Sequence, residues 1–222
     1  MTDVHCHVSA NDPTVREFLV GRDFVGIHPW ETLTPGFDLG RRLAEVEERL
    51  AASAALGVGE IGLDRLKTRD VTAAMREAFV RQLTMAAALA RPVVLHGAKC
   101  WGQVVKAVAD IKASHPEWTC AFLCHGFSRS DGLLPEIVRL GGYVSVGPSI
   151  LNDHAVNYRA MVGRIPRERI LVETDRDTTA AEGSPTIRDV TACLARVLGV
   201  SLGELEALTD DNADRFIGRR HG

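Results

Sequence analysis

The histidines are the residues in this chain whose types and spacing most clearly suggest chemistry. Four of the eight fall at the ends of short apolar, β-branched runs: His5, His7, His96 and His125. His5 and His7 are two residues apart on an expected strand, so both side chains share one face, as does Asp3. Two converging imidazoles suit a divalent metal of the zinc or manganese type. An isolated pair of this kind fits hydrogen-bonded, partly buried histidines equally well.

Two carboxylates occupy matching places. Glu60 lies within the apolar run 58–63, and Asp175 ends the run 170–175. An unpaired charge would be costly at either position, and a metal ion would compensate for it. Taken singly, Glu60 also fits an internal salt bridge to an arginine, and Asp175 also fits the N-cap of a following helix.

The candidate ligands point to a metal more strongly as a set than one by one. They stand at the ends of five expected strands: His5, His7, Glu60, His96, His125 and Asp175. In parallel α/β folds, that edge of the sheet carries the active site. Six ligands are too many for a tetrahedral site, whereas a shared carboxylate could bridge two ions about 3.5 to 4 Å apart. The pattern therefore predicts a metal centre.

The elements that would position these ligands alternate along the chain. Apolar runs typical of buried parallel strands cover residues 3–8, 24–28, 58–63, 92–96, 119–125, 143–147 and 170–175. Amphipathic helical periods lie between them, and Asp12-Pro13 marks a helix start after the first run. This order predicts an α/β fold, either an open doubly wound sheet or a barrel. Seven strands in 222 residues fall short of the usual barrel of eight strands and about 250 residues.

Composition places the chain among ordinary globular proteins. It is 45% hydrophobic and 25% charged, and its net charge of −3 gives no overall attraction to nucleic acid. No repeat or linker divides the sequence, so we expect one hydrolase domain over residues 1–222. There is no membrane-span-like run, no signal-peptide pattern and no Cys-x-x-Cys pair among the five cysteines. These features predict a cytoplasmic protein with no membrane attachment, and none of them indicates an obligate protein partner.

Seven segments, taken in order, are similar to a known family. They are residues 3–7 (Asp-Val-His-Cys-His), 26–29 (Gly-Ile-His-Pro), 59–64 (Gly-Glu-Ile-Gly-Leu-Asp), 94–96 (Val-Leu-His), 124–128 (Cys-His-Gly-Phe-Ser), 173–175 (Glu-Thr-Asp) and 212–216. Each is weakly specific alone, but the ordered set, which runs along almost the whole chain, is highly specific. It resembles the TatD-type metal-dependent deoxyribonucleases of the amidohydrolase superfamily. The resemblance implies a distorted TIM-type (β/α) barrel.

The resemblance also implies roles for the candidate ligands. One divalent ion would be held by His5, His7, Glu60 and Asp175, and a second by Glu60, His96 and His125. Glu60 would then bridge two ions, for which Zn²⁺, Mn²⁺ and Mg²⁺ are all suitable. In that picture a metal-bound hydroxide attacks phosphorus, and Asp175 is the general base that deprotonates the attacking water. Glu173 is either a partner of a ligating imidazole or part of an internal salt bridge.

Three departures from the family pattern concern the N-terminal region and the substrate. Residues 8–23 leave room for one short helix where the family has a complete extra strand and helix. We therefore expect one strand–helix unit to be missing near the N-terminus. Trp30 stands where the family usually has a second histidine, and Ala98-Lys99 where it has an arginine. The ligand positions are intact, so the departures bear on the substrate and not on the metal chemistry.

Residues just beyond the expected strands would face the substrate. Five cations follow the expected strands: Arg65, Lys67, Lys99, Arg129 and Arg176. Cations there suit phosphate groups and an aromatic ring suits a stacked base. As the residues that contact the substrate we expect His28, Trp30, Lys99, Arg129 and Arg176. Cations are common on any loop, and His28 also fits a hydrogen bond that fixes its own loop. Stacking on an exposed ring favours single-stranded nucleic-acid ends over duplex.

The leading functional hypothesis is a two-metal-ion hydrolase of phosphodiester bonds, most concretely a TatD-like deoxyribonuclease or exonuclease. The same metal chemistry serves carbonyl and phosphoryl centres, so hydrolysis of a small-molecule ester, lactone or amide is the alternative. A non-catalytic metal-binding scaffold is a second alternative, which the complete ligand set disfavours.

Overall fold

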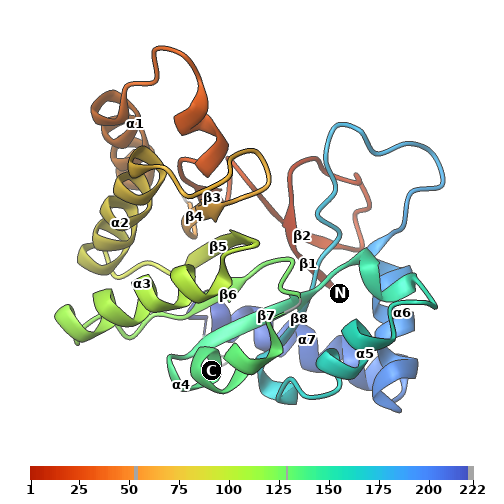
Figure 1. Ribbon diagram of the computed structural model, residues 1–222. Coiled ribbons are helices and arrows are strands. Elements are labelled where there is room, and N and C mark those ends of the chain that lie inside the picture. Colours follow the sequence, from red (N-terminus) through yellow and green to blue (C-terminus); the bar gives the residue numbers. More distant parts are fainter. Residues whose placement is uncertain (53–54, 129, 220–222) are drawn as a thin grey trace.

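The computed structural model describes residues 1–52, 55–128 and 130–219, in which short parallel strands alternate with helices (Figure 1). The strands are β1 (Thr2–Cys6), β2 (Arg16–Leu19), β3 (Phe24–Val25), β4 (Gly57–Asp64), β5 (Val93–Ala98), β6 (Phe122–Cys124), β7 (Gly142–Val146) and β8 (Ile170–Val172). The α-helices are α1 (Leu39–Ala52), α2 (Ala73–Ala88), α3 (Trp101–Ser114), α4 (Leu134–Arg139), α5 (Val156–Val162), α6 (Ile187–Leu198) and α7 (Leu202–Phe216). Short 3-10 helices are η1 (Pro29–Leu33), η2 (Asp131–Leu133), η3 (Pro148–Leu151) and η4 (Arg167–Arg169).

The strands follow one another in chain order, and every hydrogen-bonded pair is parallel. Strands β3 to β8 form one six-stranded sheet, and β1 and β2 form a second sheet of two. The two sheets approach each other at both ends without a full ladder. Val20 forms an isolated bridge with Phe24, and the Asp175 N–H donates to the His5 carbonyl at 3.0 Å. The result is a distorted, barrel-like ring that the described strands do not close into one sheet.

The inside of this ring is filled by apolar side chains. Seven strands contribute one residue each to a single cluster: Val4, Phe18, Phe24, Val94, Leu123, Tyr143 and Leu171. Ala213 and Phe216 of α7 belong to the same cluster and cover one end of it. A larger apolar core lies between the strands and the surrounding helices. The ring is therefore a packed core rather than a channel, as expected for a TIM-type arrangement.

The segment between β1 and β3 corrects the sequence-based expectation. The predicted helix start at Asp12-Pro13 is wrong, because the Asp12 carboxylate accepts the N–H and hydroxyl of Thr14 and closes a turn. The chain then enters β2, which pairs with β1 through Arg16 and Thr2. The described chain thus has eight strands instead of seven, and the shortened unit lacks its helix but keeps its strand. Only Phe18 of β2 is buried, so the apolar pattern of this strand is weak.

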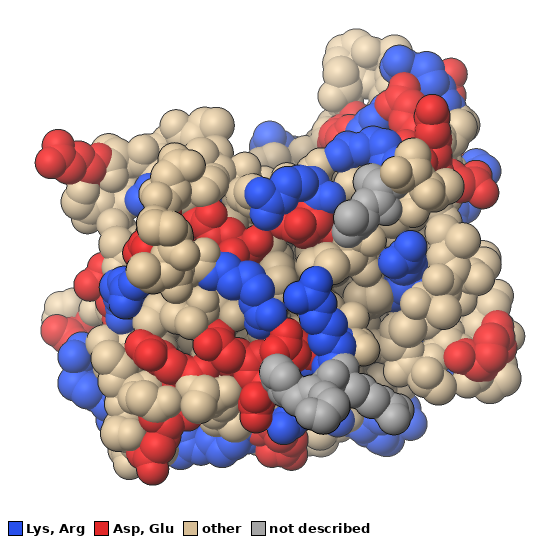
Figure 2. Space-filling model, turned by 180° about the vertical axis from the view of Figure 1, so that it is seen from behind, with Lys and Arg blue, Asp and Glu red and all other residues tan. Residues whose placement is uncertain are grey.

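The surface carries mixed charge. Seen from behind, basic and acidic side chains are interspersed with each other and with many uncharged residues (Figure 2). A face of mixed sign gives no long-range pull on a charged molecule. Among the helices of the described residues, none has the length and apolar composition that crossing a membrane requires.

Candidate metal centre

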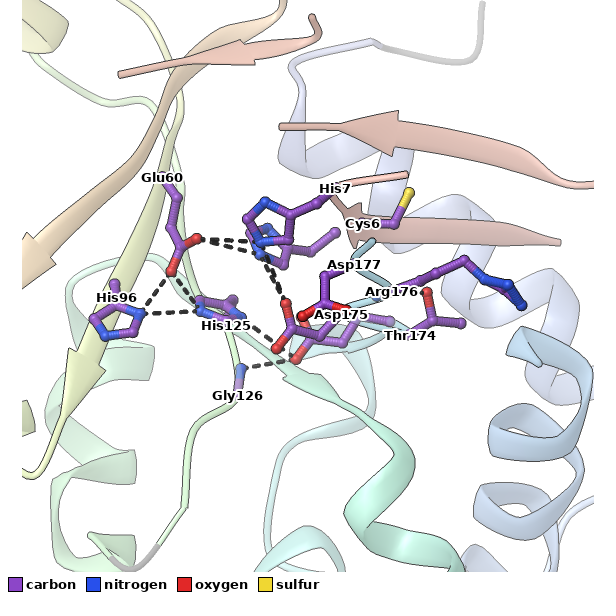
Figure 3. Close-up of polar contacts among 12 residues, drawn as sticks. Cys6, His7, Glu60, His96, His125, Gly126, Thr174, Asp175, Arg176 and Asp177 are labelled. Atoms are coloured by element: carbon purple, nitrogen blue, oxygen red, sulfur yellow. Dashed lines mark hydrogen bonds and ion pairs between the residues drawn. The ribbon is translucent and has the colours of Figure 1, made fainter. Parts of the chain in front are cut away.

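The six predicted ligands meet at the carboxyl ends of the strands (Figure 3). They lie on or just after five strands: His5 and His7 (β1), Glu60 (β4), His96 (β5), His125 (β6) and Asp175 (β8). Close contact between β4 and β5 depends on Gly62, where a Cβ atom would lie 1.9 Å from the His96 carbonyl oxygen. A side chain at position 62 would push the two strands apart and separate Glu60 from His96.

One oxygen of Glu60 faces three imidazoles. The distances from Oε1 are 2.6 Å to His96 Nδ1, 2.7 Å to His125 Nε2 and 3.7 Å to His28 Nε2. His125 Nε2 and His96 Nδ1 are themselves 3.4 Å apart. Three ring nitrogens therefore surround one carboxylate oxygen.

The other oxygen of Glu60 faces a different pair of imidazoles. His5 Nε2 and His7 Nε2 each lie 3.6 Å from Oε2. The same two nitrogens lie 3.4 and 3.5 Å from Asp175 Oδ1, so both rings stand between two carboxylates. Glu60 is buried, whereas the Asp175 side chain is 50% exposed and borders solvent.

The carboxylates of this cluster stabilise positive charge. Burial raises the pKa of Glu60, but the charge and hydrogen bond of His125 outweigh it and hold that pKa well below its usual range. Burial lowers the pKa of His125, whereas Glu60 raises it, with a net value well above the usual range. For His5, burial and the charge of His125 lower the pKa, whereas the nearby carboxylates of Asp175 and Glu60 raise it to about 9. Metal ions would replace the protons that these imidazoles hold.

The donor atoms fit metal ions in position and chemistry. Three groups have ligand atoms within 4.8 Å of one another: His5 with His7 and Glu60, His5 with His125 and Asp175, and His28 with Glu60 and His96. Within the described residues, the buried His5 Nε2 has no hydrogen-bond partner although it faces both carboxylates. Imidazole and carboxylate donors suit Zn²⁺ or Mn²⁺. His28, predicted to bind substrate, lies among these donors. His125 groups with His5 and Asp175, and its Nε2 also lies close to Glu60 and His96.

Asp64 is a partner of the centre that the sequence reasoning missed. Its Oδ2 lies 2.7 Å from His96 Nε2, on the opposite side of the ring from Glu60. A carboxylate that accepts the Nε2–H leaves Nδ1 unprotonated and pointing at Glu60, which is the tautomer a metal needs. One sequence feature could have identified Asp64: it ends the segment Gly59–Asp64, on the strand that carries Glu60.

Glu173 is the carboxylate next to the ring nitrogen of His125 that faces away from Glu60, at a longer distance than Asp64 has to His96. Its Oε1 lies 3.7 Å from His125 Nδ1 and accepts the Gly126 N–H at 2.8 Å. Glu173 is 1% exposed, and its Oε2 has no hydrogen-bond partner among the described residues. Of the two roles that the sequence left open, this geometry favours the partner of an imidazole over a salt bridge.

The buried side-chain amide of Gln82 fixes the loop that carries His28. The Gln82 side chain accepts the Ile27 N–H at 2.6 Å and donates to the Ile27 carbonyl at 3.2 Å. His28 Nδ1 accepts the Trp30 N–H at 3.2 Å and caps η1, so its Nε2 is left to face Glu60. Burial lowers the pKa of His28 to about 4, which keeps the ring neutral at neutral pH. His28 thus fixes its own loop and also points into the centre.

The remaining predicted substrate residues differ in how close they lie to the centre. Trp30 is 37% exposed, and its ring lies 6.3 Å from that of His96. Lys99 is exposed just after β5, with no contact to the cluster among the described residues. Arg176 extends away from the histidines (Figure 3) and lines a separate pocket with Asp3 and Arg188. Arg129 lies outside the described residues.

A family model described as TatD related DNase matches residues 14–218. The chain belongs to the TatD-related DNase family. Among curated relatives, the uncharacterized metal-dependent hydrolase YcfH of Escherichia coli K12 is 27% identical over 215 residues, 91% of this chain and 77% of the relative. The 3'-5' ssDNA/RNA exonuclease TatD of Cronobacter turicensis is 28% identical over 203 residues, covering 86% of this chain and 74% of that protein. The resemblance seen in the motifs is confirmed, and this TatD-family chain is a metal-dependent hydrolase.

Solved structures confirm the fold. The TatD homologue YJJV of Escherichia coli K12 superposes with a TM-score of 0.77 at 19% identity, over 97% of this chain and 96% of that one. A TatD-family hydrolase of Entamoeba histolytica gives a TM-score of 0.69 at 16% identity, over 91% of this chain and 75% of the other. The predicted distorted TIM-type architecture is therefore correct, except that the N-terminal unit keeps its strand, β2.

Proposed function

We propose that this chain is a two-metal-ion phosphodiesterase that removes nucleotides from the ends of single-stranded nucleic acid. The observation that carries the proposal is the position of Glu60. Its Oε1 faces His28, His96 and His125, and its Oε2 faces His5 and His7. A carboxylate with different imidazoles on each oxygen is the ligand expected to bridge two ions.

Two relatives support nucleic acid as the substrate class by the names they carry. One is the 3'-5' ssDNA/RNA exonuclease TatD of Cronobacter turicensis, and the other is the deoxyribonuclease TATDN3 of Homo sapiens, 25% identical over 203 residues. The half-exposed Trp30 beside His96 is consistent with a substrate that carries flat bases.

Divalent ions in this centre would activate water as a nucleophile and stabilise charge on the phosphate oxygens. Asp175 is placed to take the proton from that water, because its side chain is half exposed and borders both solvent and the imidazoles. Burial raises the pKa of Asp175, but the adjacent imidazoles of His5 and His7 outweigh it and keep the carboxylate ionised. Asp64 holds His96 with Nδ1 toward Glu60, and neutral His28 is available to donate from Nε2 to a phosphate oxygen.

The test is digestion of a single-stranded oligonucleotide labelled at one end, by chelator-stripped protein with Mg²⁺, Mn²⁺ or Zn²⁺ added back. We expect a metal-dependent ladder whose labelled end gives the polarity of digestion. Glu60→Gln and Asp175→Asn should each reduce the rate at least a hundred-fold, since each removes a ligand or the general base.

Lys106→Met is the matched control, because Lys106 is exposed on α3 and paired with Asp110. This variant should cut like the wild type. An oligonucleotide left intact with every metal, or a Glu60→Gln protein of full activity, would contradict the proposal. A panel of phosphate monoesters, lactones and amides, given to the same stripped protein, would then identify a small-molecule hydrolase.

A further inference from the structure

Lys67 and Trp30 form a contact beside the candidate metal centre. Lys67 Nζ lies 3.6 Å from the centre of the Trp30 ring, which is a close cation–π geometry. The Trp30 ring lies 4.9 Å from the His28 ring and 6.3 Å from the His96 ring. Both side chains are exposed, so a solvent-accessible cation is separated from two imidazoles of the centre by one aromatic ring.

A buried carboxylate fixes the turn that carries Lys67 relative to the centre. Asp64 Oδ1 accepts the backbone N–H of Leu66 at 2.5 Å and that of Lys67 at 3.3 Å, which shapes the turn after β4. Trp30 is placed through its own loop, because its backbone N–H donates to His28 Nδ1 at 3.2 Å. The other oxygen of Asp64, Oδ2, holds His96. The position of the Lys67 turn is therefore tied to that of a candidate metal ligand.

Lys67 is available for a ligand, unlike the neighbouring arginine. Arg65 is ion-paired with Asp70 at 3.5 Å and donates to the Arg69 carbonyl at 3.2 Å. In the part of the chain that the structure describes, Lys67 has no carboxylate partner, and its contact is the face of Trp30. A ring face attracts a cation without using up its hydrogen-bond donors, so the ammonium group can still donate to an anion.

We propose that Lys67, held by Trp30, is a subsite for a second phosphate group of the substrate, one nucleotide away from the bond that is cleaved. The inference rests on the proposed phosphodiesterase function and names how that site would select its substrate. The ammonium is a compact point charge that binds phosphate without a preferred plane. The metal centre would hold the scissile phosphate, and Lys67 would hold its neighbour.

The subsite recognises charge and not base identity. Lys67 covers one face of Trp30, so a base cannot stack on that face while the contact persists. Substrates should therefore be ranked by the number and place of their phosphates, with little dependence on sequence. A terminal phosphate next to the cleaved bond should act as a specificity element.

The test uses thymidine dinucleotides, each with one cleavable bond: one without a terminal phosphate, one with a 5'-phosphate and one with a 3'-phosphate. We expect one phosphorylated form to have a kcat/KM about five-fold above the unphosphorylated form. Lys67→Met should remove this preference, Lys67→Arg should keep it, and Lys106→Met should leave it unchanged. Trp30→Leu should weaken it, because the ammonium loses its support.

Salt dependence provides a second readout on a longer single strand. Loss of one phosphate contact should lower the slope of log KM against log salt concentration by roughly 0.7 in Lys67→Met. Equal kcat/KM for all three dinucleotides in the wild type, or a preference that survives in Lys67→Met, would overturn the subsite.

Measuring dinucleotide binding distinguishes a failure of the Lys67 subsite from a failure of the proposed phosphodiesterase function. If no dinucleotide is hydrolysed with any metal, the phosphodiesterase proposal fails. Calorimetric titration of Asp175→Asn protein, loaded with Mn²⁺, then judges the subsite alone. Tighter binding of one terminally phosphorylated dinucleotide, removed by Lys67→Met in the same background, supports the subsite, and equal binding of all three overturns it.

Discussion

The carboxylate of Asp3 receives two hydrogen bonds from Thr174, one from the backbone N–H at 3.0 Å and one from the hydroxyl at 2.6 Å. Asp3 lies on β1, two residues before His5, and Thr174 directly precedes Asp175. β1 and β8 belong to different sheets, so this part-buried pair connects β1 to the segment after β8 and helps to bring His5 and Asp175 together. It therefore bears on the geometry of the metal centre.

Thr174→Val should weaken both the fold and the metal centre. Valine keeps the shape of threonine but removes the donor to a buried carboxylate, a loss of about 1.5 to 3 kcal/mol in the free energy of unfolding. Urea denaturation of chelator-stripped protein measures this change, and Thr174→Ser, which retains the hydroxyl, should recover most of it. Metal affinity should fall more than in Val46→Ala, a core variant on α1. Equal metal affinities in the two variants would show that the pair serves stability alone.

The same carboxylate should make stability depend on pH. Burial raises the pKa of Asp3 from 3.8 to about 7, even though Thr174 and the His5 N–H partly offset it. The folded state then binds a proton that the unfolded state releases between these values. The stabilisation is complete below pH 3.8 and is lost as the pH rises through 7.

Asp3→Asn tests this dependence, because the amide cannot titrate. The stability of the wild type relative to Asp3→Asn should fall by at most about 4 kcal/mol between pH 4 and pH 8. Denaturant titrations of both stripped proteins at several pH values measure the difference. A difference that stays constant across this range would mean that Asp3 is ionised in the folded protein.

The sequence was informative where spacing alone determines position. Histidines and carboxylates at the ends of parallel strands share one edge of a sheet, so the meeting of Glu60 with His96 and His125 follows from strand boundaries. Partners across strands were not predictable in this way. Asp64 reaches His96, and Asp3 reaches Thr174, because of strand register and of a close strand approach that the sequence does not display.

The direction of a side chain just beyond a strand end could not be predicted from the sequence either. Asp175 has φ of +50°, in the left-handed region, so the alternation of the strand stops there and Arg176 is directed away from the centre. A cation that follows a strand therefore need not point at the centre, as Arg176 shows. Strand β2 was missed for a related reason, since a four-residue strand with one buried side chain has no clear periodicity.

Asp64→Asn should lower metal affinity through His96. The amide can present its N–H₂ group to Nε2 and favour the wrong tautomer, with the proton on Nδ1 where a metal would bind. We expect a 10- to 100-fold loss of apparent metal affinity in a competition assay with a metal-sensitive dye. Asp70→Asn is the control, because its carboxylate is exposed and paired with Arg65 at the surface. Wild-type affinity in Asp64→Asn would remove the orienting role.

Metal stoichiometry tests whether Glu60 bridges. Each oxygen of Glu60 faces different imidazoles, so Glu60→Gln should abolish both binding events, whereas Asp175→Asn, which faces His5 and His7, should abolish one. Elemental analysis of reloaded, desalted proteins should give two ions per wild-type chain, none in Glu60→Gln and one in Asp175→Asn. In thermal unfolding, metal at about 100 times its dissociation constant should stabilise the wild type by roughly 2.7 kcal/mol per site. Retention of one tightly bound ion in Glu60→Gln would mean that the two sites do not share this carboxylate.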